Sequence, residues 1–241
     1  MEKAFNNTIN HFGPERSDRI NSLASVINAK SYLEIGVYKG ETFFKIKVDK
    51  KTGVDPEFHF DFSKCSSDVN EFYLLTSDEF FMNKILSNIK YDIIFLDGFH
   101  ERSQTFKDFC TSIKFSNAKT IWVIDDSCPS SYLASISPRL AKLTRMLIRS
   151  KDSRWMGDVY KAIIDIRYNF PQYQIATFDL LESDNGVTQS VIWSRTKPFK
   201  SGEKNDFRKK RNYILFNKQV DSILNFKTSS EIIAEISSTV L

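Results

Sequence analysis

The sequence predicts an α/β fold in which a doubly wound, mostly parallel sheet carries helices on both faces. Short apolar segments typical of strands alternate with amphipathic segments typical of helices, which is the pattern of this fold class. Residues 91–97 form a nearly continuous apolar run, which indicates a strand buried on both faces, as in a parallel sheet. Residues 31–40 combine a short strand with a glycine-containing turn, a pair typical of nucleotide-binding sites.

The predicted elements of the first half follow in order. A covering helix at 16–29 has Ser17 or Asp18 available as its N-cap. The first strand, at 31–35, is followed by residues 41–47, which could start a helix behind the glycine turn. The remaining segments alternate regularly: strands at 51–55, 71–75, 91–97 and 120–124, with a helix capped by Ser77 and another carrying Phe106, Phe109, Cys110 and Ile113 at helical spacing.

The second half is less regular. Strands at 174–178 and 187–193 flank a turn at 184–186 and are expected to form an antiparallel hairpin, so that the final strand runs against the others. Asp158 is interpreted as a helix N-cap rather than a catalytic acid. The tail holds two short amphipathic stretches, the second capped at Ser229. We therefore expect one main domain at 1–196 and a basic linker with a helical tail at 197–241.

The overall composition is that of a globular protein. Of 241 residues, 41% are hydrophobic and 27% charged, which excludes a chain disordered throughout. Three cysteines with no close pair suggest neither a disulfide framework nor a cysteine zinc site, so a reducing cytoplasm is expected. No window approaches about 18 consecutive apolar residues, and the N-terminus is polar, so we expect no signal peptide and no membrane partner.

The positive charge is concentrated in one stretch. Residues 197–211 hold seven basic residues against Glu203 and Asp206, a local excess of +5 within a net charge of +4. The main body is therefore close to neutral, which does not favour a nucleic-acid enzyme. A non-catalytic module that binds nucleic acid or a partner through the basic stretch stays open as an alternative, although such charge runs are more often solvated linkers.

The turn after the first strand discriminates between nucleotide cofactors. A dinucleotide fingerprint needs a glycine at the position of Tyr38, where a side chain would meet the pyrophosphate. Glu34, Gly36 and Gly40 instead form an E-x-G-x-x-x-G pattern, and Asp55 follows 19 residues after Gly36, a spacing that suits a ribose diol. A nucleotide or NAD-dependent enzyme of Rossmann type remains the second alternative.

The predicted strand ends carry an unusual number of acids. Ligands bind at the carboxyl ends of strands in an open parallel sheet, and here those ends place six carboxylates along one rim: Glu34, Asp55, Asp78, Asp97, Asp125 and Asp126. Such a rim needs hydrogen bonds, a cation or a cationic ligand to offset the mutual repulsion. Each acid taken alone could equally cap a helix or a loop.

These motifs together resemble class I S-adenosylmethionine (SAM) dependent methyltransferases, in a branch associated with sugars and other small hydroxylated metabolites. The resemblance rests on the glycine turn with Asp55, on DIIFLDGFH at 92–100, on VIDDSCP at 123–129 and on WMGDVYK at 155–161. It implies a Rossmann-like, mostly parallel seven-stranded sheet with an antiparallel final strand, and an acceptor or lid segment at 127–170. It also implies SAM contacts from Glu34, Gly36, Tyr38, Gly40, Asp55, Ser77, Asp78 and Asp97.

A metal site is implied by a further resemblance, to catechol-type and macrolide-sugar O-methyltransferases. Asp97, Asp125 and Asp126 would supply the carboxylate oxygens that Mg²⁺ prefers, leaving positions for the acceptor. Asp125 and Asp126 point to opposite faces of a regular strand, so both can bind only if the chain turns between them. The competing interpretation has no metal, with Asp97 touching SAM and Asp126 capping a helix.

His100 is the candidate base, because its unperturbed pKa of about 6.5 suits removal of a hydroxyl proton during methyl transfer. A role in holding the loop is the alternative. The sequence therefore predicts a SAM-dependent O-methyltransferase with catalytic His100 and Asp97, acting on a small hydroxylated acceptor such as a sugar or secondary metabolite. Assistance by Mg²⁺ and assembly into a homo-oligomer are left open.

Overall fold

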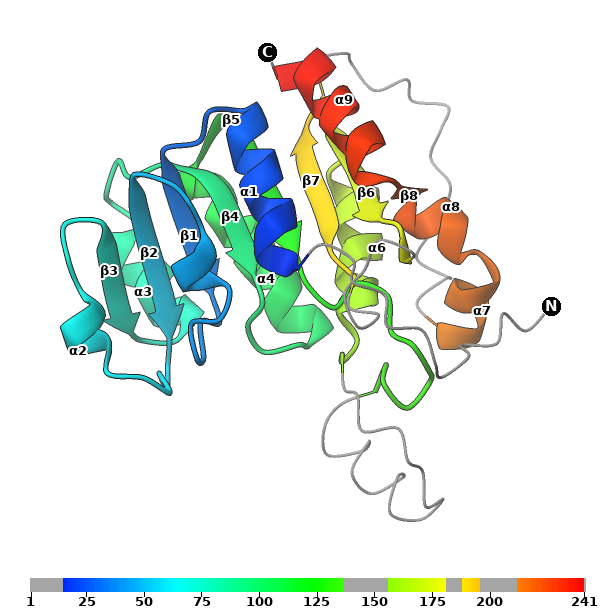
Figure 1. The fold of residues 1–241 in the computed structure, drawn as a ribbon. Coiled ribbons are helices and arrows are strands. Elements are labelled where there is room, and N and C mark those ends of the chain that lie inside the picture. Colours follow the sequence, from blue (N-terminus) through cyan, green and yellow to red (C-terminus); the bar gives the residue numbers. More distant parts are fainter. Residues whose placement is uncertain (1–14, 137–155, 181–187, 196–211, 241) are drawn as a thin grey trace.

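The computed structural model describes residues 15–136, 156–180, 188–195 and 212–240, which form one eight-stranded sheet. The strand order is β3-β2-β1-β4-β5-β7-β6-β8 (Figure 1). Five parallel strands come first: β1 (Ser31–Ile35), β2 (Lys50–Asp55), β3 (Asn70–Leu74), β4 (Tyr91–Leu96) and β5 (Ser116–Ile124). β7 (Ser190–Ser194) is antiparallel to β5 and to β6 (Tyr173–Phe178). The predicted fold class and the late hairpin are confirmed.

The eighth strand was not predicted. The two-residue strand β8 (Phe226–Lys227) pairs in parallel with β6 at the edge of the sheet. A segment this short has no detectable period, because alternation is recognisable only over about four residues or more. The prediction of seven strands was wrong by this one element.

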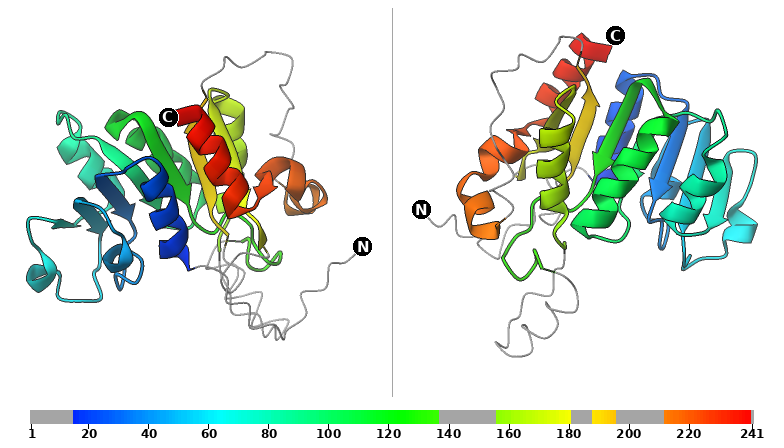
Figure 2. Two further views of the ribbon diagram at one scale, coloured as in Figure 1. Left: turned by 45° about the horizontal axis from the view of Figure 1, so that its top comes forward. Right: turned by 180° about the vertical axis from the view of Figure 1, so that it is seen from behind.

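Helices cover both faces of the sheet, as Figure 2 shows from two sides. α1 (Arg16–Val26) and α9 (Ser229–Val240) lie on one face, where Ile20, Leu23 and Ile236 are fully buried with the side chains of alternate strand residues. α3 (Ser77–Lys84), α4 (Arg102–Ser112) and α6 (Val159–Asn169) lie on the other, packed through apolar side chains such as Phe109. All six residues of β4 are buried, as its apolar run predicted.

Several helix boundaries and caps in the structure differ from those predicted from the sequence. α1 ends at Val26, and its N-cap is Glu15 instead of Ser17 or Asp18; the Asp18 carboxylate accepts a hydrogen bond from the Glu15 N–H at 3.2 Å. The helix expected after the glycine turn is a single 3-10 turn, η1 (Phe43–Lys45). The 14 residues that separate β1 from β2 contain only this helical turn.

The described part of the predicted tail packs against the sheet. α7 (Tyr213–Lys218), α8 (Val220–Leu224), β8 and α9 bury Phe216, Leu224 and Ile232. Thr228 caps α9, where Ser229 was predicted: its hydroxyl accepts from the Glu231 N–H and the Glu231 carboxylate accepts from the Thr228 N–H. The basic stretch at 197–211 and the turn at 184–186 lie outside the described residues. Within the described ranges no helix has both the length and the apolar character needed to cross a bilayer.

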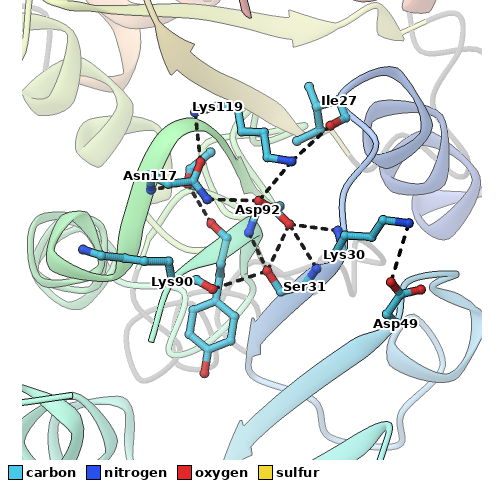
Figure 3. A network of polar contacts seen from close by, with 10 residues as sticks. Ile27, Lys30, Ser31, Asp49, Lys90, Asp92, Asn117 and Lys119 are labelled. Atoms are coloured by element: carbon cyan, nitrogen blue, oxygen red, sulfur yellow. Dashed lines mark hydrogen bonds and ion pairs between the residues drawn. The ribbon is translucent and has the colours of Figure 1, made fainter. Parts of the chain in front are cut away.

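At the amino ends of the strands, Asp92 joins three strands (Figure 3). Its carboxylate accepts hydrogen bonds from the backbone N–H groups of Lys30 and Ser31 and from the Asn117 amide, with the Lys119 ammonium at 3.5 Å. Burial opposes the charged form, but these hydrogen bonds and the Lys119 charge outweigh it and lower the pKa of Asp92. Asp92 therefore holds the start of β1, β4 and β5 together, at the end of the sheet away from the acidic rim.

Candidate functional site

A pocket of about 1180 Å³ opens at the carboxyl ends of the parallel strands. Of the residues predicted to contact SAM, those that line it are Gly36, Tyr38, Asp55, Ser77, Asp78 and Asp97. The candidate base His100 and the paired acids Asp125 and Asp126 line the same pocket. Glu34 and Gly40 are not among the residues that line it. The structure thus gathers most of the predicted site residues, from the ends of five strands, around one space.

The glycine turn is explained by packing. Gly36 has φ +90°, and a side chain there would overlap the Asp97 carbonyl, so glycine lets the end of β1 lie directly against the end of β4. Gly40 has φ +78°, and a Cβ would overlap the Phe44 ring. Gly36 therefore shapes the pocket wall, while Gly40 is required by the turn and by Phe44.

Glu34 lies under the turn and is almost fully buried, 2% exposed. The Tyr32 hydroxyl donates a hydrogen bond to its carboxylate at 2.6 Å. Burial raises the pKa of Glu34 to about 8, against the lowering effects of Tyr32, Arg16 and Lys51. A neutral Glu34 near pH 7 is one way in which the structure removes charge from the acidic rim.

Asp55 is held in place by the backbone. Its two carboxylate oxygens accept hydrogen bonds from the N–H groups of Tyr38 and Glu57, both at 2.8 Å. Each carboxylate oxygen has a second lone pair, so the group can still accept from two hydroxyls of a ligand. This arrangement is suited to the ribose diol that the sequence predicted for Asp55.

The region around Ser77 and Asp78 includes two residues that sequence reasoning missed. The Gln104 amide nitrogen lies 3.0–3.1 Å from Ser77 Oγ, Asp78 Oδ1 and Asp108 Oδ1, three acceptors for two hydrogens. Burial raises the pKa of Asp108 to about 6. Gln104 and Asp108 are four apart on α4 and so share one helix face, but only the packing of α4 beside α3 turns that face toward the pocket.

The remaining acids surround His100. Asp126 has φ +53°, so the chain does turn after Asp125, as two adjacent ligands would have required. His100 Nδ1 lies 2.6 Å from Asp126 Oδ2, and Nε2 lies 3.5 Å from Asp97 Oδ1. Burial favours the neutral ring, but the contact with Asp126 and the charge of Asp125 prevail and raise the pKa of His100. The imidazole is thus held between two carboxylates at the pocket wall.

The segment around Gly157 supports His100 from behind. Gly157 has φ +66°, and a side chain there would overlap the His100 carbonyl oxygen. The next residue, Asp158, occupies the N-cap position of α6, but its carboxylate accepts from the backbone N–H of Arg102 at 2.7 Å and so caps α4. Asp158 is a capping residue, as predicted, for a different helix.

Arg16 is the main residue of the site that the sequence did not reveal. Its Nη1 atom lies 2.7 Å from Asp125 Oδ2 and 3.0 Å from Asp97 Oδ2. The charge of Asp125, followed by that of Asp97, raises the pKa of Arg16 despite its burial. Burial and the neighbouring carboxylates raise the pKa of Asp97 well above its usual range and that of Asp125 to about 6. Arg16 stands 81 residues before Asp97 in the chain, so no local pattern could pair them.

The acids predicted as metal ligands are only partly brought together. The group whose candidate ligand atoms lie within 4.8 Å of one another is Asp97, His100 and Asp126. Asp125 accepts from Arg16 instead, as does one oxygen of Asp97. Mg²⁺ requires near-octahedral oxygen ligands, whereas this group includes an imidazole nitrogen and a carboxylate already bound to a guanidinium. The arrangement does not fit Mg²⁺.

Comparison with known proteins was made for sequence and for structure. No family model and no curated protein matches the sequence. Among solved structures, an O-methyltransferase from Bacillus cereus in complex with S-adenosylhomocysteine (SAH) is similar, with 14% identity and a TM-score of 0.51 over 73% of this chain and 80% of that one. A protein assigned as an O-methyltransferase from Klebsiella pneumoniae is 13% identical, with a TM-score of 0.50 over 73% and 78% of the two chains. The chain has the fold of the class I SAM-dependent O-methyltransferases.

Proposed function

We propose that the protein is a SAM-dependent methyltransferase that acts on a hydroxyl oxygen of a small acceptor. The observation that carries the proposal is the pocket at the ends of β1–β5, which six of the eight predicted cofactor residues line together with a histidine. The fold shared with O-methyltransferases supports this reading. The reducing cytoplasm expected from the sequence is part of the proposal.

The pocket residues fit SAM by their chemistry. Asp55, fixed by two backbone N–H groups, retains lone pairs for the ribose hydroxyls. Asp78 and Asp108 stand near Ser77 with acceptor oxygens for the amino group of adenine, and Tyr38 and Phe99 offer exposed aromatic faces at 53% and 61% exposure. When bound, SAM supplies an electrophilic methyl group on a sulfonium.

His100 is the proposed base. With SAM bound, transfer of its methyl group to the acceptor oxygen would release the hydroxyl proton, which His100 would take up at a ring nitrogen. The 2.6 Å contact between Nδ1 and Asp126 holds the ring and would stabilise the imidazolium that forms. Because Arg16 occupies the carboxylates expected to bind Mg²⁺, no step is assigned to a metal. A sugar or secondary metabolite remains the proposed acceptor.

The first test is ligand binding. SAM or SAH at 100 times its Kd should stabilise the folded protein by about 2.7 kcal/mol, measured as a thermal shift beside NAD. A shift with NAD but with neither sulfur ligand would replace the proposal by the nucleotide-enzyme alternative. With an acceptor in hand, His100→Gln should slow methyl transfer by about 10²–10⁴-fold while SAH binding is kept; an unchanged rate would remove His100 as the base.

A further inference from the structure

The acidic end of the pocket already contains a cation of its own. A buried carboxylate, Asp125, and a partly buried one, Asp97, share one guanidinium nitrogen of Arg16. We propose that Arg16 is the resident counter-cation of these two acids, and that a divalent cation can bind them only when Arg16 is displaced. The inference concerns the pocket of the proposed function. It does not depend on that function, because the test below measures metal binding without turnover.

The geometry makes the two cations alternatives. A single atom, Nη1, lies within 3.0 Å of Oδ2 of both Asp97 and Asp125. A metal bound to the same two oxygens at about 2.0–2.1 Å would share them with the Arg16 guanidinium and weaken both contacts. It would also place a second full positive charge close to the guanidinium. Repulsion between the two cations therefore opposes metal binding as long as Arg16 stays in contact with Asp97 and Asp125.

Arg16 is held in position by the fold. It is the first residue of α1, whose Ile20 and Leu23 are fully buried against the sheet. α1 also packs against α9 on the same face (Figure 1). The guanidinium thus projects from a helix fixed to the core, and its side chain is only 37% exposed. Arg16 therefore lines the pocket from a helix that the core holds in place.

Charge balance gives the same result. Three acidic side chains surround His100 and Arg16: Asp97, Asp125 and Asp126. Removing Arg16 from these part-buried ion pairs leaves the carboxylates without their counter-charge, which is unfavourable. A protein that lacked Arg16 would therefore bind an external cation more readily at Asp97 and Asp125. That gain is the measurable consequence of the proposal.

The experiment uses the full chain without SAM and measures Mn²⁺ binding by electron paramagnetic resonance, with Mg²⁺ in competition. The variants are Arg16→Ala, Arg16→Gln and the control Lys45→Ala. Lys45 pairs with Glu15 at the same end of α1 but does not line the pocket, so its loss removes an equal charge without freeing the acids. Wild type and Lys45→Ala should bind Mn²⁺ weakly and alike, and the Arg16 variants at least about tenfold more tightly.

Two results would overturn the proposal. One is Mn²⁺ binding to wild type as tight as to the Arg16 variants, which would show that the arginine does not exclude the ion. The other is equally weak binding to the folded Arg16 variants and to Lys45→Ala. If Arg16→Ala fails to fold, the comparison of Mn²⁺ binding between Arg16→Gln and wild type still tests the proposal. None of these readouts requires turnover. A result that contradicts the role of Arg16 can therefore be told apart from a result that contradicts the proposed methyl transfer.

Discussion

Replacing Glu34 by glutamine should make the protein's stability less dependent on pH. The side chain is 2% exposed and accepts the Tyr32 hydroxyl at 2.6 Å, a contact that the glutamine carbonyl can keep. Burial raises the pKa of Glu34 from 4.5 to about 8. The folded state therefore holds a proton that the unfolded state has lost between these two pH values. Its contribution to stability is complete below about pH 4.5 and is lost as the pH rises through 8.

The size of the effect follows from that interval. One pKa unit corresponds to about 1.36 kcal/mol, so between pH 5 and pH 9 the burial of this carboxylate should cost wild type roughly 2–4 kcal/mol that Glu34→Gln avoids. All other titrating groups are common to the two proteins. Their difference in unfolding free energy therefore isolates Glu34.

Urea unfolding at pH 5, 7 and 9 measures this difference. The control is Glu71→Gln, since Glu71 also accepts a tyrosine hydroxyl two residues away, from Tyr73, but on an exposed surface. Relative to wild type, Glu34→Gln should gain stability steadily with pH, whereas Glu71→Gln should change by less than about 0.5 kcal/mol. A difference for Glu34→Gln that stays constant from pH 5 to 9 would refute a protonated Glu34.

Three further predictions concern the site and its frame. Asp55→Ala should weaken SAH binding by roughly 5- to 100-fold in isothermal titration calorimetry, through two lost hydrogen bonds of about 0.5–1.5 kcal/mol each; unchanged affinity would move the ribose site elsewhere. Asp92→Asn should lower the urea-unfolding free energy by about 1–3 kcal/mol at neutral pH. Because the folded pKa of Asp92 is lowered, that loss should disappear as the pH falls through it, and a loss equally large in acid would contradict the assignment. Gly157→Ala should reduce both thermal stability and turnover, since its Cβ would overlap the His100 carbonyl. Gly98→Ala should be tolerated better, because the nearest atom to its Cβ would lie at 3.4 Å. Equal effects of the two substitutions would exclude the packing argument.

The central strands and the acids at their ends were predictable because the relevant signals are local. A buried strand such as β4 reads as a continuous apolar run, and a carboxylate that follows it must lie at the carboxyl edge of the sheet. Asp55, Asp97 and His100, all predicted as site residues from the sequence, line one pocket in the structure. The prediction failed for residues 41–47, where the helical pattern gives only the single turn η1.

The rest of the site depends on contacts between distant segments. Arg16 reaches Asp125 across 109 residues, and Gln104 reaches Ser77 across 27. Each of these side chains sits on a predicted helix with an ordinary amphipathic pattern, so its sequence neighbours carry no signal of the partner. The pairing is set by where α1 and α4 dock on the sheet, which is a tertiary property.

The acidic rim shows how this matters for function. Six carboxylates at the strand ends predicted a need for positive charge, to be met by SAM or by Mg²⁺. In the structure each acid has its own means of compensation within the chain: backbone N–H groups for Asp55, Lys107 and Gln104 for Asp78, Arg16 for Asp97 and Asp125, His100 for Asp126, and a raised pKa for Glu34. A count of acids therefore overstates the demand for an external ion. Among the hydrogen bonds and ion pairs of the described residues, Asp55 and Glu34 have no cationic side-chain partner, and of these two only Asp55 lines the pocket. Asp55 is therefore the best placed of the six to accept from a neutral diol.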